Sequence, residues 1–330
     1  MGHVQVGRGL RSYREAAPPR HPKEHHTVTT WPRTLDRAGI TTPALRDAYS
    51  AQRGLVARYA RAEYTAVRLL LPAPLVPHVI AATAFMHHSD NLIDQGPLDQ
   101  RLSALADWST RTRAALAEES AHLDPLLAAL RHTALTHPQL RPHIEAYLKG
   151  GELEARWTGF AAEDDFRAYV DTYALPAFMV IASLLTPPDE PEAFEAGCRA
   201  FILGSQRLDF LEDLAEDLRS GRLGVPEEAL ADCGLTRDAL LARPDPALVR
   251  TLVRHQAALV RPDLTTAAQL EHLVRAPHRP FLRALVRLQS ARLTAAEAHG
   301  PKLLESAPGA PLGRAASILV RAWVSRGMGS

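Results

Sequence analysis

The prolines of this chain fall almost entirely between segments in which apolar residues recur every three or four positions. This arrangement restricts the fold most, because a proline beyond the first turn of a helix breaks or kinks it. Pro176 is the exception, and we expect it to kink the helix that contains it. No run of alternating β-branched residues indicates a strand, so the sequence predicts an all-α fold. The predicted helices span residues 44–71, 77–96, 99–119, 122–136, 139–157, 164–186, 191–220, 246–273, 279–304 and 312–326.

The N-terminal 34 residues differ in composition from the rest of the chain. They carry six basic and two acidic residues but no apolar period, which predicts a disordered basic arm over residues 1–34. Residues 35–330 are predicted to form a single all-α domain, since 46% of the chain is apolar and can fill one large core.

Composition excludes several classes of protein. Basic and acidic residues balance at 38 and 37, whereas a general nucleic-acid binder usually carries a clear basic excess, so no nucleic-acid partner is expected. The two cysteines, Cys198 and Cys233, are too few for a disulfide scaffold. The N-terminus has no apolar signal core, and three prolines interrupt the uncharged run 69–89, which indicates a buried helix. A cytoplasmic location is therefore expected.

One pair of carboxylates closes an otherwise apolar helical segment. Asp90 and Asp94 are four residues apart, so on a helix they point the same way, one turn apart. Thr83 and His87 fall on the same stripe when the helix is projected backward, and the other residues of 79–86 are apolar or small. Such a pair does not fit a solvated helix face, so it is a candidate functional site.

A second acidic array lies about 120 residues further along the chain. Asp209, Asp213 and Asp217 repeat every four residues, with Glu212 and Glu216 beside them. Each like-charge pair costs about 0.2–0.5 kcal/mol in an isolated helix, so the stacked acids suggest neutralising cations, although one acidic face alone could simply be solvated. Two arrays on separate helices could face each other across a bundle and clamp a Mg²⁺–diphosphate, since Mg²⁺ prefers carboxylate and phosphate oxygens.

With these motifs, the chain resembles the squalene/phytoene synthase family of isoprenoid synthases, as a divergent member. The likeness runs from about residue 44 to about residue 300, and two aspartate motifs in order with matching flanks are more specific than either motif alone. The three matching blocks are Leu70-Leu71-Pro72 with Asp90-Asn91-Leu92-Ile93-Asp94, Glu163 to Tyr169 with Gly150 and Glu154 upstream, and Gln206 to Pro226.

The resemblance implies an isoprenoid-synthase helical bundle around a central cavity. In the family, several Mg²⁺ ions held by both aspartate motifs draw off the diphosphate of an allylic substrate, and the carbocation reacts in an apolar cavity that excludes water. The chain has no match to the basic C-terminal segment linked to NADPH use, so NADPH is not expected. The implied metal ligands are Asp90, Asp94, Asp209, Asp213, Glu216 and Asp217. The implied catalytic residues are Asp90, Asp94, Asp213, Asp217 and His87.

Five further residues are candidates for substrate binding. Arg222 matches the family's basic residue after the second motif and could bind diphosphate, or it could be an ordinary arginine at a helix C-terminus. Tyr64 matches an early aromatic position but could pack in the core, and Gln206 could be a polar site residue or a surface one. Thr83 stands where the family commonly has a tyrosine. Phe178 replaces a small residue of the family's cavity wall, which predicts a shorter or bent cavity unless Phe178 only packs in the core.

Several other positions depart from the family pattern. His87 replaces an arginine and could act as a cation beside the diphosphate, as a base after ionisation, or only as a hydrogen-bond partner of Asp90 and Asp94. The diphosphate and metal half of the pattern is retained, while the groups that guide rearrangement are largely altered. The remaining altered positions are Arg61, Glu63, Glu212, Gly224 and Gln289.

Three functions stay open at this point. The plainest is head-to-head condensation of two farnesyl or geranylgeranyl diphosphates by a Mg²⁺-dependent synthase. The altered tyrosines also allow cyclisation of a single prenyl diphosphate or prenyl transfer to an unusual acceptor. A third function is that of an assembly protein that kept the fold and lost catalysis, but such a protein has no evident need for stacked carboxylates. An apolar product suggests transient contact with a membrane surface, and the sequence is compatible with both a monomer and a homodimer.

Overall fold

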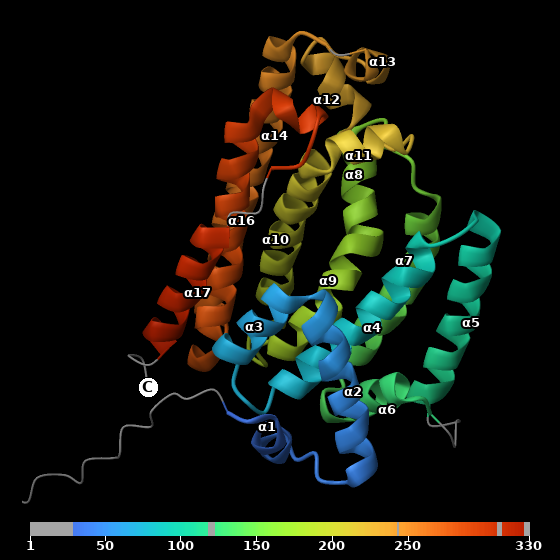
Figure 1. The fold of residues 1–330 in the computed structure, drawn as a ribbon, viewed down its shortest axis with the longest axis vertical. Helices are drawn as coiled ribbons and strands as arrows, with labels where there is room; N and C mark the ends of the chain where they lie inside the picture. Colours follow the sequence, from blue (N-terminus) through green and yellow to red (C-terminus); the bar gives the residue numbers. More distant parts are fainter. Residues whose placement is uncertain (1–28, 118–122, 243, 309–311, 327–330) are drawn as a thin grey trace, which may run out of the picture.

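The computed structural model describes residues 29–117, 123–242, 244–308 and 312–326. Within these ranges the chain forms an elongated helical bundle with no strand and one isolated bridge, between Gly159 and Leu223 (Figure 1). This confirms the predicted all-α fold. The α-helices are α1 (Trp31–Arg37), α2 (Pro43–Tyr59), α3 (Arg61–Leu70), α4 (Val76–Asp94), α5 (Leu98–Leu116), α6 (Pro125–Thr136), α7 (Leu140–Arg156), α8 (Glu163–Tyr169), α9 (Leu175–Ala182), α10 (Pro191–Glu212), α11 (Leu214–Arg219), α12 (Glu227–Asp232), α13 (Arg237–Leu241), α14 (Pro246–Ala267), α15 (Leu270–Leu273), α16 (Arg279–His299) and α17 (Leu312–Arg326). The other helices are the π-helix η1 (Val170–Ala174) and the 3₁₀-helices η2 (Ser183–Leu185), η3 (Ala276–His278) and η4 (Gly300–Leu304).

Prolines mark the starts of several helices, because a missing amide hydrogen costs nothing in the first turn. At α6, the carboxylate of Asp124 also caps the helix by accepting hydrogen bonds of 3.0 Å from the backbone amides of Leu126 and Leu127. The carboxylate of Asp245 caps α14 in the same way, accepting from the amide of Ala247 at 2.8 Å. The α-helices that begin on a proline are α2 at Pro43, α6 at Pro125, α10 at Pro191 and α14 at Pro246.

Three of the predicted helices are each interrupted once, among them the one over 246–273, which forms α14 and α15. The sequence pattern also missed the short helices α12 and α13. The helix predicted over 44–71 is interrupted at Ala60, whose ψ of 56° leaves the helical region. The helix predicted over 191–220 is interrupted at Asp213, between α10 and α11. The amide of Asp213 still donates to the carbonyl of Asp209 at 2.9 Å, and its carbonyl accepts from the amide of Asp217 at 2.9 Å. The four-residue spacing of the acidic array therefore survives the break.

The predicted N-terminal arm over 1–34 ends too late. Residues 1–28 lie outside the described residues, but Trp31–Arg37 form α1, so residues 31–34 belong to the helical part of the chain. Trp31 is buried, and its indole nitrogen donates to the hydroxyl of Ser50 at 2.9 Å. Thr34 and Leu35 are buried as well, but the helix is too short to show an apolar period. The single domain over 35–330 stays a prediction.

Pro176 lies just after a π-turn, and the predicted kink stays a prediction. Its ring nitrogen cannot donate to the carbonyl of Thr172. The residues before it, Val170–Ala174, form η1, in which the amide of Leu175 donates five residues back. Pro262 lies inside α14 as well, so Pro176 is not the one interior proline that the sequence analysis expected.

Gly150 of α7 lies directly against this π-turn. A Cβ atom at Gly150 would lie 2.3 Å from the carbonyl oxygen of Thr172, so a larger residue cannot fit unless the backbone moves. The close approach brings Tyr173 of η1 beside Tyr147 of α7, with ring centroids 5.7 Å apart. The two tyrosines enter the candidate site together from these two segments.

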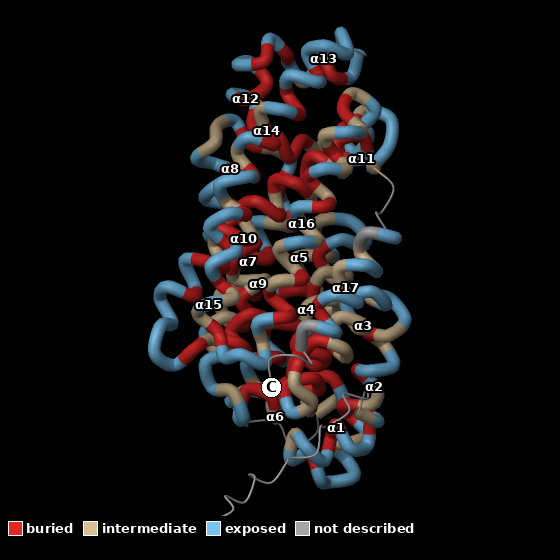
Figure 2. Tube along the Cα trace, turned by 90° about the vertical axis from the view of Figure 1, so that its left-hand side faces the viewer, coloured by how far each residue is buried: buried red, intermediate tan, exposed pale blue. Residues whose placement is uncertain are grey.

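Buried residues run along the long axis of the bundle, as Figure 2 shows in red. The largest core cluster draws residues from α1 through α10 and from α14 through α17. The segment 163–185, which comprises α8, η1, α9 and η2, is the one segment of the described residues that is long and apolar enough to cross a membrane. Most of it is buried, and it packs against α7 and α10. A buried core helix meets the same criterion, so this segment is weak evidence for a membrane span.

Candidate active site

Asp90 lies on α4 and accepts hydrogen bonds from two tyrosines of neighbouring helices. The hydroxyl of Tyr147 donates to Asp90 Oδ1 at 2.6 Å, and that of Tyr173 donates to the same oxygen at 3.3 Å. Burial raises the pKa of the Asp90 carboxyl, and the two phenols partly offset the rise. Burial also raises the pKa values of both phenols well above their ordinary range, so both remain neutral hydrogen-bond donors.

Arg222 connects the first carboxylate array with the second. Its guanidinium forms a 3.1 Å ion pair with Asp217, which is 3% exposed. Burial raises the pKa values of Asp94 and Asp217, and the positive charge of Arg222 opposes the rise at both. Asp94 belongs to the first array and Asp217 to the second, so the positive charge of Arg222 acts on a carboxylate of each predicted motif.

A second arginine, Arg292 on α16, binds the start of the second array. Its Nη2 lies 2.6 Å from Asp209 Oδ1 and 2.6 Å from Glu212 Oε2, and its Nη1 donates to Gln289 Oε1 at 3.0 Å. Burial alone would lower the pKa of this guanidinium, but the two carboxylates raise it. Asp209, one of the implied metal ligands, is thus bound by an arginine. Glu212 stands where the family has an arginine, and here the guanidinium comes from α16.

The middle of the second array carries the least compensated negative charge. Asp213 lies at the break between α10 and α11 and forms no ion pair with any described residue. Burial, and then the charges of Asp209, Asp217 and their acidic neighbours, raise the pKa of Asp213 to about 6. Glu216 is exposed beside it. A carboxylate whose charge is disfavoured to this extent is suited to bind a cation.

Glu154 on α7 adds a further carboxylate to the site. The hydroxyl of Tyr169 donates to Glu154 Oε2 at 2.6 Å. Burial raises the pKa of Glu154, and among the smaller effects the charge of Asp94 raises it and that of Arg222 lowers it. Glu154 therefore lies in the same electrostatic environment as both aspartate arrays.

Aromatic rings line the site beside Arg222. The guanidinium carbon lies 5.5 Å from the ring centroid of Trp157, and Trp157 stacks on Phe210 at 4.9 Å. A Cβ atom at Gly224 would lie 2.2 Å from Cγ of Phe210. No side chain therefore fits at Gly224, where the family has a tyrosine, while Phe210 occupies that space. The other rings of this cluster are Phe160, Phe166 and Tyr169.

His87 is held by Tyr59 and Asn91 and makes no described hydrogen bond to the aspartates. Its ring stacks on that of Tyr59 with centroids 3.4 Å apart, and its Nε2 lies 3.1 Å from the amide nitrogen of Asn91. After the larger effects of burial and the tyrosines, His87 still lowers the pKa of Asp90. His87 therefore acts on Asp90 through its charge. Among the described residues it forms no hydrogen bond to Asp90 or Asp94.

The other predicted substrate-binding residues are spread more widely, and in the described part of the chain none forms a hydrogen bond or ring contact with either array. The hydroxyl of Thr83 donates to a backbone carbonyl of its own helix at 2.8 Å. The hydroxyl of Tyr64 accepts from an arginine of α2 at 2.9 Å. Phe178 stacks on Phe201 with centroids 5.0 Å apart. Gln206 lies half-buried on α10, one turn before the second array.

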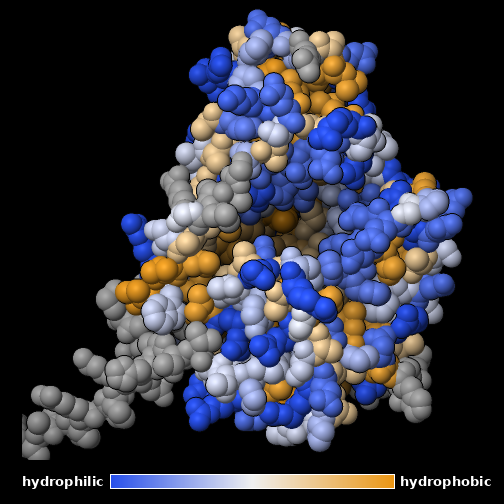
Figure 3. All heavy atoms as spheres, viewed as in Figure 1, coloured by the Kyte–Doolittle hydropathy of each residue, from blue (hydrophilic) through white to orange (hydrophobic). Residues whose placement is uncertain are grey.

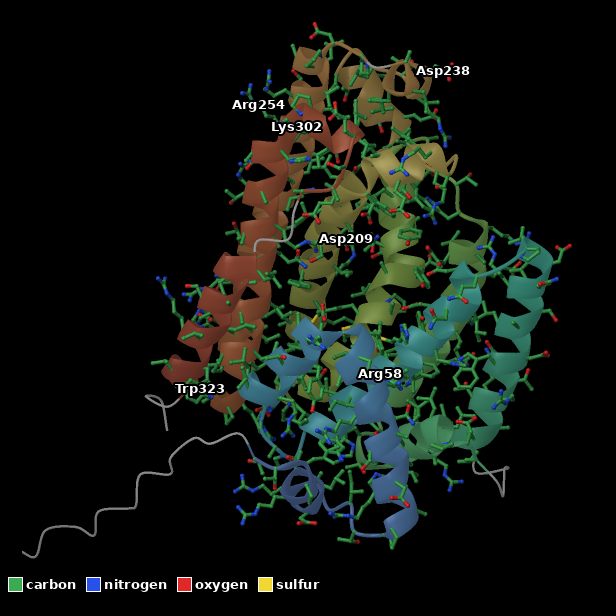
Figure 4. The ribbon with its side chains drawn as sticks, viewed as in Figure 1. Arg58, Asp209, Asp238, Arg254, Lys302 and Trp323 are labelled. Atoms are coloured by element: carbon green, nitrogen blue, oxygen red, sulfur yellow. The ribbon has the colours of Figure 1, made fainter. Side chains whose placement is uncertain are left out.

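The molecule is hollowed near the middle of one face, as Figure 3 shows. Apolar residues lie at the bottom of the hollow, and hydrophilic residues gather above it. Figure 4 marks Asp209 in the interior of the bundle at the same height.

The donor set suits a hard divalent cation that also binds the substrate. All implied ligands are carboxylates, whose oxygens Mg²⁺ prefers, and the pKa of about 6 at Asp213 reflects uncompensated negative charge. Across the described ranges, no three His, Cys, Asp or Glu side chains converge closely enough to hold a metal ion by themselves. Mg²⁺ commonly takes one or two carboxylates and completes its shell with substrate phosphates and water. The residues fit that mode of binding.

The residues of this site that were not predicted as site residues include Tyr147, Glu154, Trp157, Tyr169, Tyr173 and Arg292. A signal existed for Tyr147, Glu154 and Tyr173, since Tyr147, Gly151 and Glu154 share one helical stripe and Tyr173 follows Tyr169 by one turn. Arg292 gave no such signal, because its partners lie 80 and 83 residues away along the chain.

The chain is similar in sequence and fold to known proteins of one family. The chain matches the squalene/phytoene synthase family model over residues 56–316. It is 32% identical over 207 residues to the bifunctional protein CrtB/UppS of Streptomyces coelicolor, covering 61% of this chain and 35% of that protein. It is 26% identical over 184 residues to phytoene synthase 3, chloroplastic, of Zea mays, covering 54% of this chain and 42% of that protein. The chain thus spans about a third to a half of the length of the curated relatives that it matches.

Two solved structures share the fold. Squalene synthase HpnC from Alicyclobacillus acidocaldarius superimposes with a TM-score of 0.72 at 23% identity, covering 80% of this chain and 98% of that one. A dehydrosqualene synthase in complex with ligand superimposes with a TM-score of 0.75 at 17% identity, covering 88% of this chain and 98% of that one. The helical bundle is therefore that of the squalene synthases.

Proposed function

The chain belongs to the squalene/phytoene synthase family, and from this premise we propose that it is a Mg²⁺-dependent prenyltransferase that joins two prenyl diphosphates head to head. Farnesyl and geranylgeranyl diphosphate are the proposed substrates. The observation that carries the proposal is the ion pair of Arg222 with Asp217 of the second array, together with the effect of the Arg222 charge on Asp94 of the first. A diphosphate bound there would meet cationic donors, and metal ions bound with it would meet carboxylates.

The site offers unused hydrogen-bond donors as well as carboxylates. The Nε of Arg222 and the indole nitrogen of Trp157 are buried and have no hydrogen-bond partner among the described residues. Buried donors are normally satisfied, and the two side chains lie together next to the second array, so they are suited to donate to diphosphate oxygens. When bound, Mg²⁺ would neutralise the diphosphate and make it a better leaving group.

The tyrosines orient the carboxylates without adding charge. Because burial raises their pKa values well above the ordinary range, Tyr147, Tyr169 and Tyr173 stay protonated at neutral pH. They donate to Asp90 and Glu154 and so fix the direction of those carboxylates. The same rings, with the aromatic cluster around Phe210, keep water from a carbocation formed beside them.

One observation favours the alternative that the protein cyclises a single prenyl diphosphate. Phe178 on α9 stacks on Phe201 on α10 with centroids 5.0 Å apart, at a stretch where small residues would line a long cavity. Two stacked rings leave less length for a polyprenyl chain, and a shorter cavity suits one folded substrate.

Turnover of defined substrates separates these functions. Purified protein would be incubated with Mg²⁺ and with prenyl diphosphates of ten to twenty carbons, while released diphosphate and extractable hydrocarbons are measured. A product of thirty or forty carbons supports head-to-head condensation, and a terpene of ten to twenty carbons supports cyclisation. Absence of turnover with every substrate would contradict both and favour a non-catalytic assembly protein.

Phe178→Gly tests the proposed limit on chain length. Removing the ring opens the wall between α9 and α10, so preference should shift toward the longer prenyl diphosphate, read as the ratio of kcat/KM values for fifteen- and twenty-carbon substrates. Leu248→Ala, which truncates an exposed side chain on α14, serves as the control. An unchanged ratio in Phe178→Gly would show that this residue only packs in the core.

A further inference from the structure

A cavity of about 410 Å³ is lined by residues of α1, the start of α4, the end of α6, η2 and η3. Helices α1 and α6 lie at one end of the bundle (Figure 1). This volume falls within the range of about 300–1,000 Å³ that is common for small-molecule sites. Its lining combines two arginines and three histidines with prolines and leucines, and none of the described lining residues is acidic. The cavity therefore has positive and apolar surfaces but no counter-charge.

The positive groups of this cavity are not used by the fold. Arg37 and Arg275 line the cavity and form no ion pair or side-chain hydrogen bond with any described residue. His278 also lines it, and its Nδ1 is buried without a hydrogen-bond partner in the part of the chain that the structure describes. Arg37 and Arg275 are exposed, so solvent can satisfy them. Burying the Nδ1 of His278 without a partner is costly unless something binds it.

The inner wall of the cavity is rigid and neutral. His78 is 2% exposed, and its Nδ1 lies 3.3 Å from the hydroxyl of Tyr49 and 3.2 Å from that of Thr133. Its ring packs edge-on against His137 with centroids 4.6 Å apart. Burial, and then the neighbouring histidines, lower the pKa of His78 to about 3. These contacts occupy Nδ1 and fix the position of the His78 ring.

We propose that this cavity binds an organic phosphate with an apolar body. Arg37 and Arg275 would hold the phosphate oxygens, because guanidinium groups match them with paired charge-assisted hydrogen bonds. His278 would add a donor through its unpaired Nδ1. The prolines and leucines of the lining, including Pro74 and Leu184, would cover the apolar body.

A metal ion does not explain this cluster. Three histidines in one cavity are a common start for a transition-metal site, but in the described ranges no group of three ligating side chains has the geometry to hold an ion. The unpaired arginines favour an anion instead. This assignment does not depend on the proposed prenyltransferase activity, because the cavity shares no residue with the carboxylate arrays.

Binding can be measured on the full chain in the presence of EDTA, which removes the divalent cations that a diphosphate would need at the carboxylate arrays. The probe is n-hexyl phosphate, which is not an isoprenoid, with inorganic phosphate and n-hexanol as comparisons. The imidazole resonances of His78, His137 and His278 are followed by NMR on protein labelled with ¹³C-histidine. We expect n-hexyl phosphate to shift these three resonances and to leave that of His255 on α14 unchanged.

Two variants decide whether the lining carries the binding. The double variant Arg37→Gln with Arg275→Gln should weaken the binding of n-hexyl phosphate about tenfold or more, as expected for lost charge-assisted hydrogen bonds. Arg254→Gln on α14 should leave the binding unchanged. Unchanged binding in the double variant, or the absence of any shift at the three histidines, would overturn the proposal. Inorganic phosphate or n-hexanol binding as tightly as n-hexyl phosphate would overturn the claim that both head and body are recognised.

Discussion

The two carboxylate arrays are held in opposite ways. In the first, the neutral phenols of Tyr147 and Tyr173 donate to Asp90 and add no charge. In the second, the guanidinium groups of Arg292 and Arg222 bind carboxylates directly. A neutral donor orients a carboxylate and leaves its full charge available to a cation, whereas an arginine cancels that charge. From this comparison we infer that Asp90 keeps its charge available to a cation, whereas in the second array arginines cancel charge at Asp209, Glu212 and Asp217 and leave Asp213 uncompensated.

The largest effect is expected at Asp90. Its carboxylate is oriented by two phenols, and no described arginine or lysine forms an ion pair with it. Asp90→Asn keeps the shape and removes the charge, so kcat should fall about a hundred- to a thousandfold, the loss typical of removing a key electrostatic group. The measurement is diphosphate release from farnesyl diphosphate with saturating Mg²⁺. Asp99→Asn, an exposed position at the start of α5, is the control. Near-full activity of Asp90→Asn would end the assignment of the first array to metal binding.

A smaller effect is expected when only the orienting phenol is lost. Tyr147→Phe removes the 2.6 Å hydrogen bond to Asp90, and loss of such a supporting partner typically weakens metal binding about ten- to a hundredfold. The Mg²⁺ concentration for half-maximal activity should rise accordingly. Tyr173→Phe removes the longer bond of 3.3 Å and should have the weaker effect. The reverse order would mean that the tyrosines do not act through Asp90.

At the second array, removing an arginine should change the Mg²⁺ requirement in the other direction. Arg292→Gln frees Asp209 and Glu212, so the Mg²⁺ concentration for half-maximal activity should fall about threefold, while KM for the prenyl diphosphate rises as the site becomes more negative. Arg292→Lys keeps the charge and should lie closer to the parent protein. Arg287→Gln, exposed on the same helix, is the control. A rise in the Mg²⁺ requirement of Arg292→Gln would contradict the claim that Arg292 cancels carboxylate charge in the second array.

The smallest effect concerns stability without metal. Asp213 has a pKa of about 6 in the folded protein and about 3.9 when unfolded, so between these values the folded state binds more protons. Stability then falls as pH rises through this window, and the loss is complete above pH 6. Asp213→Asn removes the loss, so in EDTA its Tm should exceed that of the parent protein by about 2 °C at pH 7.5. At pH 4 the difference should nearly vanish, and an equal difference at both pH values would contradict the assigned cause.

Much of the fold could be predicted because helical periodicity and prolines act locally. The starts of several long helices follow from prolines such as Pro125 and Pro191. The breaks at Ala60 and Asp213 were missed because no proline or glycine marks them in the sequence. Helix α1 was missed because its seven residues are too few to show an apolar period.

The candidate site could be predicted less completely. Asp90 and Asp217 were found because carboxylates at helical spacing leave a pattern along the chain. The pairing of Arg292 with Glu212 joins two helices across the bundle, and one charge among many arginines carries no spacing signal. The stacking of His87 on Tyr59 likewise depends on how α2 packs against α4, which residue spacing cannot reveal.

The π-turn η1 makes the site depend on chain length as well as on residue type. An α-helix advances 100° per residue, and a π-turn carries one extra residue in its turn. Tyr169 before η1 reaches Glu154, and Tyr173 at its end reaches Asp90. Deleting any one residue between 170 and 174 would rotate α8 against α9 by about 100°, and the two phenols could not both keep their carboxylates. We therefore expect this turn to tolerate conservative substitutions on its outer side but no deletion.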